Sequence, residues 1–242
     1  MIVAIHQPNL FPRLKILQKL ALADIWVVLD NVQYCQREYQ NRTLIVPSKG
    51  KEFWCTIPVH LPSGQSTKIK DVEFASIGAI DKINQTLKCN FVNNENNISC
   101  KNKILTEIKQ HENNFAEFVV ASTTILLEIA EVCPKVVYAS QLGETRFDKN
   151  ERLIDLCKAV GGDTYIADSG GAHYIDVEKF KDNQVSLLWQ VWETPQNESA
   201  VSMKNSIRNS SSLNILMRSK QDFIDAVLQS KISRKRIYAE GK

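Results

Sequence analysis

Two short apolar segments near the start of the chain each run directly into a group of polar residues. Residues 1–5 are followed by His6-Gln-Pro-Asn9, and residues 25–29 are followed by Asp30-Asn-Val-Gln33. Short apolar runs rich in β-branched residues are typical of buried strands. The apolar residues within 14–22 recur at helical spacing. A strand, a crossover helix and a second, parallel strand are therefore the simplest prediction.

The polar residues after these two segments are the first candidates for a functional site. In an open α/β sheet, ligands bind beyond the carboxyl ends of parallel strands, where the loops can carry polar groups. His6 and Asp30 should lie on the same edge, with His6 as a general base or acid and Asp30 either orienting it or taking a proton itself. The alternatives are a strand-end histidine satisfied by its neighbours and an Asp-Asn pair that forms a turn.

The rest of the chain predicts the fold class. Turn signals and β-branched residues indicate a small β-hairpin insertion at about 43–60, and helical spacing indicates a helical insertion at about 76–132. Strands and helices then alternate at short spacing. We expect an α/β fold with a Rossmann-like, mainly parallel sheet and helices on both faces. Residues 1–242 are expected to form a single domain.

The second half of the chain adds three expectations about individual elements. A helix should begin after Asp148, which is a candidate N-cap with Glu151 three residues later. The polar stretch between Glu193 and Ser212 should be a loop that is mobile or ordered only by a ligand. The basic run Lys231-Ile-Ser-Arg-Lys-Arg236 is expected to be a solvated terminus.

Composition and motif content exclude several classes of function. With 30 basic and 27 acidic residues the net charge is +3, which gives no reason to expect a nucleic-acid partner. No apolar run approaches the roughly 20 residues of a membrane span, and no basic leader opens the chain, so we expect a cytoplasmic protein. The six cysteines form no C-x-x-C pair, so neither a disulfide framework nor a metal site is predicted. Cys35 as a nucleophile near His6 is a minor alternative to a packing role.

Several spaced motifs resemble the WbqC-like protein family over most of the chain. The N-terminal matches are His6-Gln-Pro-Asn9, Asp24, Leu29-Asp-Asn-Val-Gln-Tyr34 and Gln40-Asn-Arg42. The later matches are Asn150-Glu-Arg-Leu-Ile154, Gly162-Asp-Thr-Tyr165, Ser169-Gly-Gly171 with Tyr174, and Leu213-Asn-Ile-Leu216. The family is known mainly from gene clusters for O-antigen and other bacterial surface polysaccharides, which the resemblance implies as context. The chain departs from the family pattern at Leu10, Arg13, Lys15 and Asn31, and these changes bear on the identity of the substrate.

The residues and the resemblance together give a set of expected binding residues. Side-chain amides suit sugar hydroxyls, arginines suit phosphate or carboxylate groups, and the Ser169-Gly-Gly171 loop offers backbone N–H groups to a phosphate or an oxyanion. The expected substrate-binding residues are Gln7, Asn9, Asn31, Gln33, Arg37, Asn41, Arg42, Ser169, Gly170 and Tyr174.

The expected function is transfer of an acyl or aminoacyl group to the amine of a nucleotide-linked sugar during surface polysaccharide biosynthesis. No bound cofactor is expected, and the donor would be an activated acyl group such as a thioester of coenzyme A or of an acyl carrier protein. Neither G-x-G-x-x-G nor a Walker loop occurs, so a dinucleotide or ATP site of those kinds is not expected. The alternatives are a nucleotidylyltransferase-like enzyme, because strand, His-Gln-Pro and helix follow in that order, and a non-catalytic sugar-nucleotide binding protein.

Overall fold

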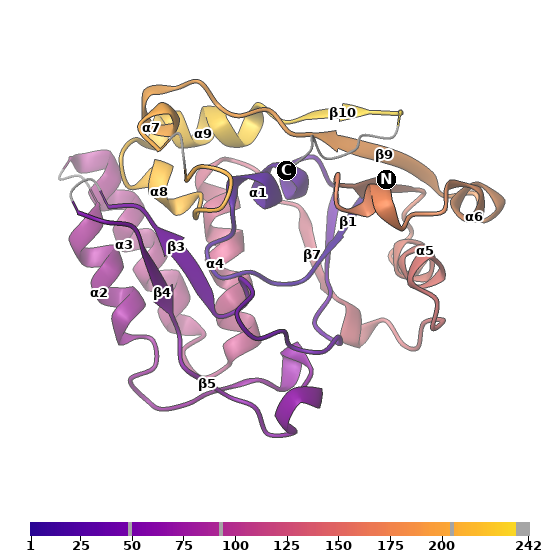
Figure 1. The fold of residues 1–242 in the computed structure, drawn as a ribbon, viewed down its shortest axis with the longest axis horizontal. Coiled ribbons are helices and arrows are strands. Elements are labelled where there is room, and N and C mark those ends of the chain that lie inside the picture. Colours follow the sequence, from indigo (N-terminus) through magenta and orange to yellow (C-terminus); the bar gives the residue numbers. More distant parts are fainter. Residues whose placement is uncertain (48–49, 92–93, 204–205, 236–242) are drawn as a thin grey trace.

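The centre of the molecule is a six-stranded sheet with the strand order β10-β9-β8-β1-β2-β7 (Figure 1). The computed structural model describes residues 1–47, 50–91, 94–203 and 206–235. Four of the five neighbouring strand pairs are parallel, and only β10 runs antiparallel, to β9. The predicted Rossmann-like α/β class is confirmed. The strands are β1 (Ile2–His6), β2 (Ile25–Val28), β7 (Lys135–Tyr138), β8 (Thr164–Ala167), β9 (Ser186–Val191) and β10 (Lys231–Ser233).

Helices cover both faces of this sheet because successive strand side chains point to opposite faces. On one face, Ala4, Trp26 and Ile166 pack into a core shared with α1 (Leu14–Ala21), α4 (Phe115–Ile129) and α9 (Lys220–Leu228). The adjacent residues Val3, Val27 and Tyr165 belong to a second core on the other face. There they pack with α5 (Lys149–Ala159) and α6 (Val177–Asp182).

The strand order contains a reversal next to β1. From β1 the chain moves outward through β2 to β7, and it then returns to the other side of β1 as β8 and continues to β9. The connections from the two neighbouring strands β1 and β8 therefore leave in opposite directions. Such a topological switch point opens a crevice at the carboxyl ends of the two strands. His6 ends β1, and Asp168 follows directly after β8.

The two predicted insertions are present and pack against the main core. β3 (Arg42–Ile45) pairs with β4 (Phe53–Thr56), and the short strands β5 (Val59–His60) and β6 (Glu73–Phe74) form a second pair. The helical insertion consists of α2 (Asp81–Asn90), α3 (Glu95–Gln110) and α4. Helix α3 begins within a run rich in asparagine. The Asn94 side chain accepts a hydrogen bond from Asn97 N at 2.9 Å and starts the helix inside the asparagine-rich run.

Two segments for which no helix or strand was predicted contain secondary structure. In the polar stretch 193–212, α7 (Glu198–Val201) forms and Ser210, Ser211 and Ser212 are each 1% exposed; residues 204–205 lie outside the described part. The hydroxyls of Ser211 and Ser212 donate to the carbonyls of Phe11 and Pro12, both at 2.7 Å. The polar side chains of this segment therefore satisfy buried backbone carbonyls. In the basic run, Lys231–Ser233 forms the edge strand β10 with Lys231 and Ile232 exposed, in agreement with the expected solvation, while residues 236–242 lie outside the described part.

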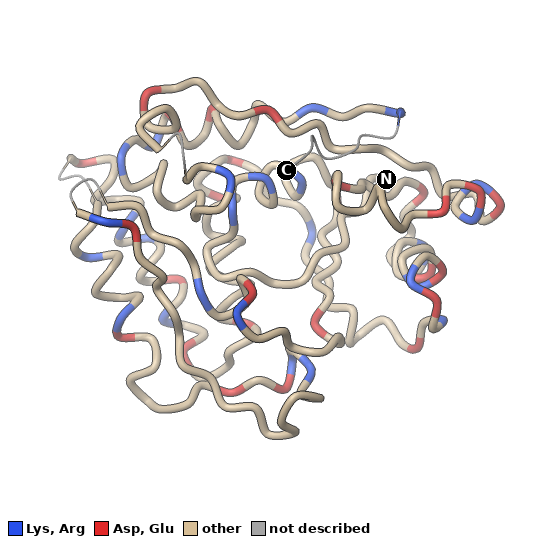
Figure 2. The backbone as a smooth tube through the Cα atoms, viewed as in Figure 1, with Lys and Arg blue, Asp and Glu red and all other residues tan. Residues whose placement is uncertain are grey.

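Charged residues are distributed over the whole backbone, with basic and acidic positions interspersed (Figure 2). Among the described helices, none has both the length and the apolar character that a membrane span requires.

Candidate functional site

A cavity of about 210 Å³ lies at the carboxyl ends of β1 and β8, at the switch point of the sheet. Its walls are Ile5, His6, Gln7, Lys19, Leu29, Leu153, Tyr165, Asp168, Gly171 and Tyr174. A larger hollow of about 730 Å³ lies over the insertion, but its charged side chains, such as Lys70 and Glu112, are exposed to water. We place the functional site at the smaller cavity because it gathers titratable groups that are withdrawn from solvent.

His6 is held at this cavity in the neutral form. Its Nδ1 lies 2.7 Å from the carbonyl oxygen of Gln7. A carbonyl oxygen only accepts, so Nδ1 carries the proton and Nε2 is the acceptor atom of the ring. Burial, and next the positive charge of Lys19, lower the pKa of His6 to about 4. At neutral pH the imidazole is therefore able to accept a proton at Nε2.

Lys19 and Asp168 form a charge pair beside the imidazole. Lys19 is 2% exposed, and its Nζ lies 4.0 Å from Asp168 Oδ2 and 3.4 Å from the carbonyl oxygen of Ile5. Burial lowers the pKa of Lys19. Burial acts to raise the pKa of Asp168, but the charges of Lys19 and Lys15 outweigh it and hold that pKa well below its usual range. Asp168 is therefore an anion at every physiological pH.

The local folding of α1 places two lysines at this site. Lys15 and Lys19 are one helical turn apart and so lie on the same side of α1. The Lys15 Nζ donates to Ser169 Oγ at 2.8 Å, which ties α1 to the loop after β8. The Asp168 Oδ1 accepts from Gly170 N at 2.8 Å and from Gly171 N at 3.2 Å, and these bonds fix the carboxylate within the same loop.

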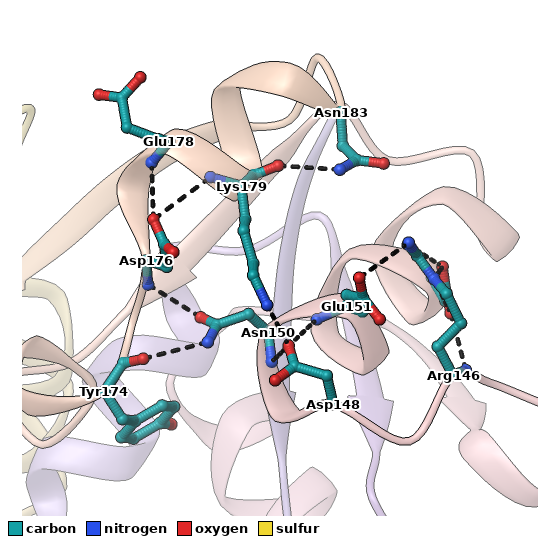
Figure 3. Close-up of polar contacts among 10 residues, drawn as sticks. Arg146, Asp148, Asn150, Glu151, Tyr174, Asp176, Glu178, Lys179 and Asn183 are labelled. Atoms are coloured by element: carbon teal, nitrogen blue, oxygen red, sulfur yellow. Dashed lines mark hydrogen bonds and ion pairs between the residues drawn. The ribbon is translucent and has the colours of Figure 1, made fainter.

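Tyr174 lies at the mouth of the cavity, where it is 48% exposed. Its backbone is positioned by Asn150, whose Nδ2 donates to Tyr174 O at 3.1 Å and whose Oδ1 accepts from Asp176 N at 2.9 Å (Figure 3). Asp148 caps α5, as predicted, by accepting from Asn150 N and Glu151 N. The motif residue Asn150 thus connects the start of α5 to the cavity wall and acts as a positioning residue.

Of the expected site residues, His6, Gln7 and Tyr174 line the cavity together, and Ser169 directly follows Asp168 of the wall and accepts a hydrogen bond from Lys15. Gly170 belongs to the same loop. Its N–H, expected to receive a phosphate or an oxyanion, is bonded to Asp168. The predicted meeting of the Ser169-Gly-Gly171 loop with the His6 segment across one edge of the sheet agrees with the pairing of β1 and β8.

Asp30 has a different partner from the one expected. It is 2% exposed, and its Oδ1 and Oδ2 accept from the backbone N and the hydroxyl of Ser140 at 2.9 and 2.6 Å. This carboxylate therefore joins the end of β2 to the end of β7. The neighbouring Asn31 Oδ1 accepts from Arg152 Nη2 at 2.6 Å. The carboxylate that shares a cavity with His6 is that of Asp168.

The remaining expected residues do not line the cavity and make internal contacts. Gln33 donates to Gln65 O, Asn41 donates to Ile57 O and Asn9 donates to Pro8 O, at 2.7, 2.8 and 3.0 Å. The Arg42 guanidinium stacks over the Trp54 ring at 4.1 Å and donates to the carbonyl oxygen of Arg37. One bond reaches the cavity wall directly, from Gln40 Nε2 to Gln7 Oε1 at 2.8 Å.

Sequence reasoning did not assign Lys19, Asp168 or Tyr165 to the site. Two signals were present in the sequence: Lys19 interrupts the apolar side of the predicted helix, and Asp168 directly follows the short apolar run Tyr165-Ile-Ala167. Within the described residues, no group of three or more His, Cys, Asp or Glu side chains is arranged to hold a metal ion.

The fold is that of an α/β protein with a cavity at the switch point of a Rossmann-like sheet. The model of the WbqC-like protein family matches residues 7–225, and the chain belongs to this family. It is 24% identical over 205 residues to the uncharacterized protein Rv1507c of Mycobacterium tuberculosis, covering 77% of this chain and 80% of that protein. No solved structure matches the chain.

Proposed function

We propose that this protein is a cytoplasmic transferase that acylates or aminoacylates the amine of a nucleotide-linked amino sugar for a bacterial surface polysaccharide such as O-antigen. The observation that carries the proposal is the position and protonation state of His6. Its neutral ring lines the switch-point cavity beside the Lys19–Asp168 charge pair, and Nε2 is its acceptor nitrogen. General-base chemistry at neutral pH needs an unprotonated imidazole next to the reacting amine.

In the proposed reaction the sugar amine attacks the carbonyl carbon of a thioester of coenzyme A or of an acyl carrier protein. His6 Nε2 accepts the amine proton, the C–N bond forms and the C–S bond breaks, and the proton leaves with the thiolate. The Gly170 N–H, first expected to serve the oxyanion, is bonded to Asp168, and the side-chain amide of the expected binding residue Asn9 is bonded to Pro8 O. We assign the oxyanion contact to Gln7. Its Oε1 accepts a hydrogen bond from Gln40, so its Nε2 is the end that would donate to the oxyanion.

The proposed nucleotide contacts are Arg37 and Arg42. They lie on the segment that Gln40 joins to Gln7, so a substrate whose amine lies at His6 would extend its phosphates toward them. Arginine recognises phosphate through paired N–H donors. The cavity of about 210 Å³ is too small for a whole sugar nucleotide, so only the reacting end would enter it.

The second candidate is a protein that binds a sugar nucleotide without chemistry. It is favoured by the fact that Asp30, expected to act with His6 in catalysis, is used in internal hydrogen bonds to Ser140.

Mass spectrometry separates the two functions. The protein would be incubated with UDP- and dTDP-linked amino sugars, each with a panel of acyl and aminoacyl thioesters, and the mass of the sugar nucleotide would be followed. Transfer predicts a mass gain equal to the acyl group, with one free thiol released per transfer. Binding detected by calorimetry without a mass gain for any donor would contradict the transferase and support the binding protein.

A further inference from the structure

Several basic side chains surround the one carboxylate in the wall of the switch-point cavity. Lys19 and Asp168 lie in the wall as a charge pair, and the imidazole of His6 is neutral. Lys15 and Arg13 bring further positive charge to the same groups from outside the wall. Asp168 is thus shared by Lys19 and Lys15, and Lys19 has no carboxylate of its own.

Lys19 is the basic residue of the wall that lacks a close acceptor. Its contacts are long: 3.4 Å to the Ile5 carbonyl, 4.0 Å to Asp168 Oδ2 and 5.6 Å to the centre of the Tyr165 ring. Charge-assisted bonds from an ammonium to a carboxylate are normally about 2.7–2.9 Å long. Lys19 is 2% exposed, so its ammonium has N–H donors for which no acceptor lies at the normal distance of a charge-assisted bond.

We propose that this cavity receives a terminal carboxylate of the substrate, which binds Lys19 Nζ beside His6. A carboxylate carries one negative charge and matches the single ammonium of Lys19, whereas a phosphate dianion would bring two negative charges beside the Asp168 carboxylate. The cavity volume of about 210 Å³ is large enough for a terminal group of the substrate. It does not suit a diphosphate, which is flanked on both sides by larger groups.

The carboxylate narrows the class of substrate. This step rests on the proposed function: if His6 serves the reacting amine, then amine and carboxylate lie on the same end of the acceptor, as in an amino sugar acid. Carboxylate binding itself needs neither donor nor turnover, so it is measured separately from transfer. Failure of one leaves the other intact.

The first test follows the imidazole proton signals of His6 by NMR at pH 7 during titration with propionate, propionamide and inorganic phosphate at constant ionic strength. We expect a saturable shift of His6 with propionate, at least about tenfold weaker binding of the other two, and no shift of the exposed His60. An equal response to propionamide or phosphate, or none to propionate, would overturn the proposal.

The second test repeats the propionate titration on Lys19→Met and on the matched control Lys181→Met. Lys181 is an exposed lysine of α6 that pairs with Glu178 at 3.6 Å. Propionate affinity should fall at least about tenfold in Lys19→Met and stay unchanged in Lys181→Met. Unchanged affinity in Lys19→Met would contradict the proposal, and if that variant does not fold, the wild-type titration decides.

Discussion

His6 is kept neutral by its surroundings, and this property connects its position to its proposed role. The Gln7 carbonyl orients the ring, and burial together with the charge of Lys19 lowers its pKa to about 4. A histidine in water, with a pKa near 6.5, would be partly protonated in the same pH range. The cavity therefore stabilises the form that accepts a proton, at a cost to stability in acid.

That cost gives a prediction for the pH dependence of stability. Between about pH 6.5 and pH 4 the unfolded chain binds a proton at His6 and the folded chain does not, so the free energy of unfolding should fall as the pH falls through this window. The contribution of His6 should be at most about 3 kcal/mol. Urea unfolding of wild type and His6→Gln at several pH values would measure it. A difference between the two proteins that does not change with pH would contradict a lowered pKa.

Individual site residues could be predicted from the sequence where they lie on the segments that follow predicted strands. His6, Gln7 and Tyr174 were expected at the site, and they line the cavity. Lys19 was not expected there, because its role depends on contact with Asp168, 149 positions later in the chain. Asp30 follows a strand as Asp168 does, and only the tertiary structure shows that Ser140 satisfies it.

Among the elements, the loop that follows β1 is held in an unusual conformation. Phe11 has a φ of 40°, in the left-handed region that non-glycine residues rarely adopt, and its side chain is fully buried. Its N–H donates to Ser122 Oγ at 3.0 Å, and its carbonyl accepts from Thr43 and Ser211 at 3.1 and 2.7 Å. Side chains from three distant segments thus fix the loop that begins at His6.

Removing one of these contacts should destabilise the protein measurably. The Ser211 hydroxyl donates to Phe11 O and accepts from Leu213 N at 3.1 Å. Ser211→Ala should lower the free energy of unfolding by about 1–3 kcal/mol, because the buried partners are left unsatisfied. Chemical denaturation would measure the change. Ser202→Ala, at an exposed serine that bonds only within its own helical turn, is the control; equal effects would argue against a special role for Ser211.

The strands and most helices could be predicted because their apolar periodicity is local. Predicted segments 1–5 and 25–29 correspond to β1 and β2, with bounds that differ by one residue. The burial of residues 210–212 could not be predicted, since three consecutive serines are polar by composition. Two of their hydroxyls bond to the buried carbonyls of residues 11 and 12, which only the tertiary structure brings near.

On the scale of the whole molecule, the insertion and the sheet share one core. Ile83 and Ile104 of the insertion belong to the same cluster of buried residues as Leu17 and Phe223, on helices that cover the sheet. Such continuity should make the two parts unfold together. The single domain over residues 1–242 stays a prediction that calorimetry can test.

Calorimetry should show one thermal transition with equal calorimetric and van't Hoff enthalpies. Leu87→Ala, at a fully buried position of the insertion, should lower the temperature of the entire transition, because it removes about 2–5 kcal/mol of stability. Two separate transitions, with only one of them affected by Leu87→Ala, would show that the insertion is an independent domain.

The strand order decides where the site lies. Because β8 returns beside β1, residues 6 and 168 meet at one edge although they are far apart in the chain. Sequence patterns predicted parallel strands and a shared edge. The order of those strands, which brings β8 to β1, follows from packing that no local pattern encodes.

The most direct test of the switch-point cavity as an active site is the turnover of His6→Ala at saturating donor and acceptor, compared with His60→Ala. Both residues are histidines at strand ends, but His60 is exposed and lies on β5. Loss of a general base predicts a fall in kcat of about 10²–10⁴-fold for His6→Ala and no change for His60→Ala. Full turnover by a correctly folded His6→Ala protein would contradict a catalytic site at the ends of β1 and β8.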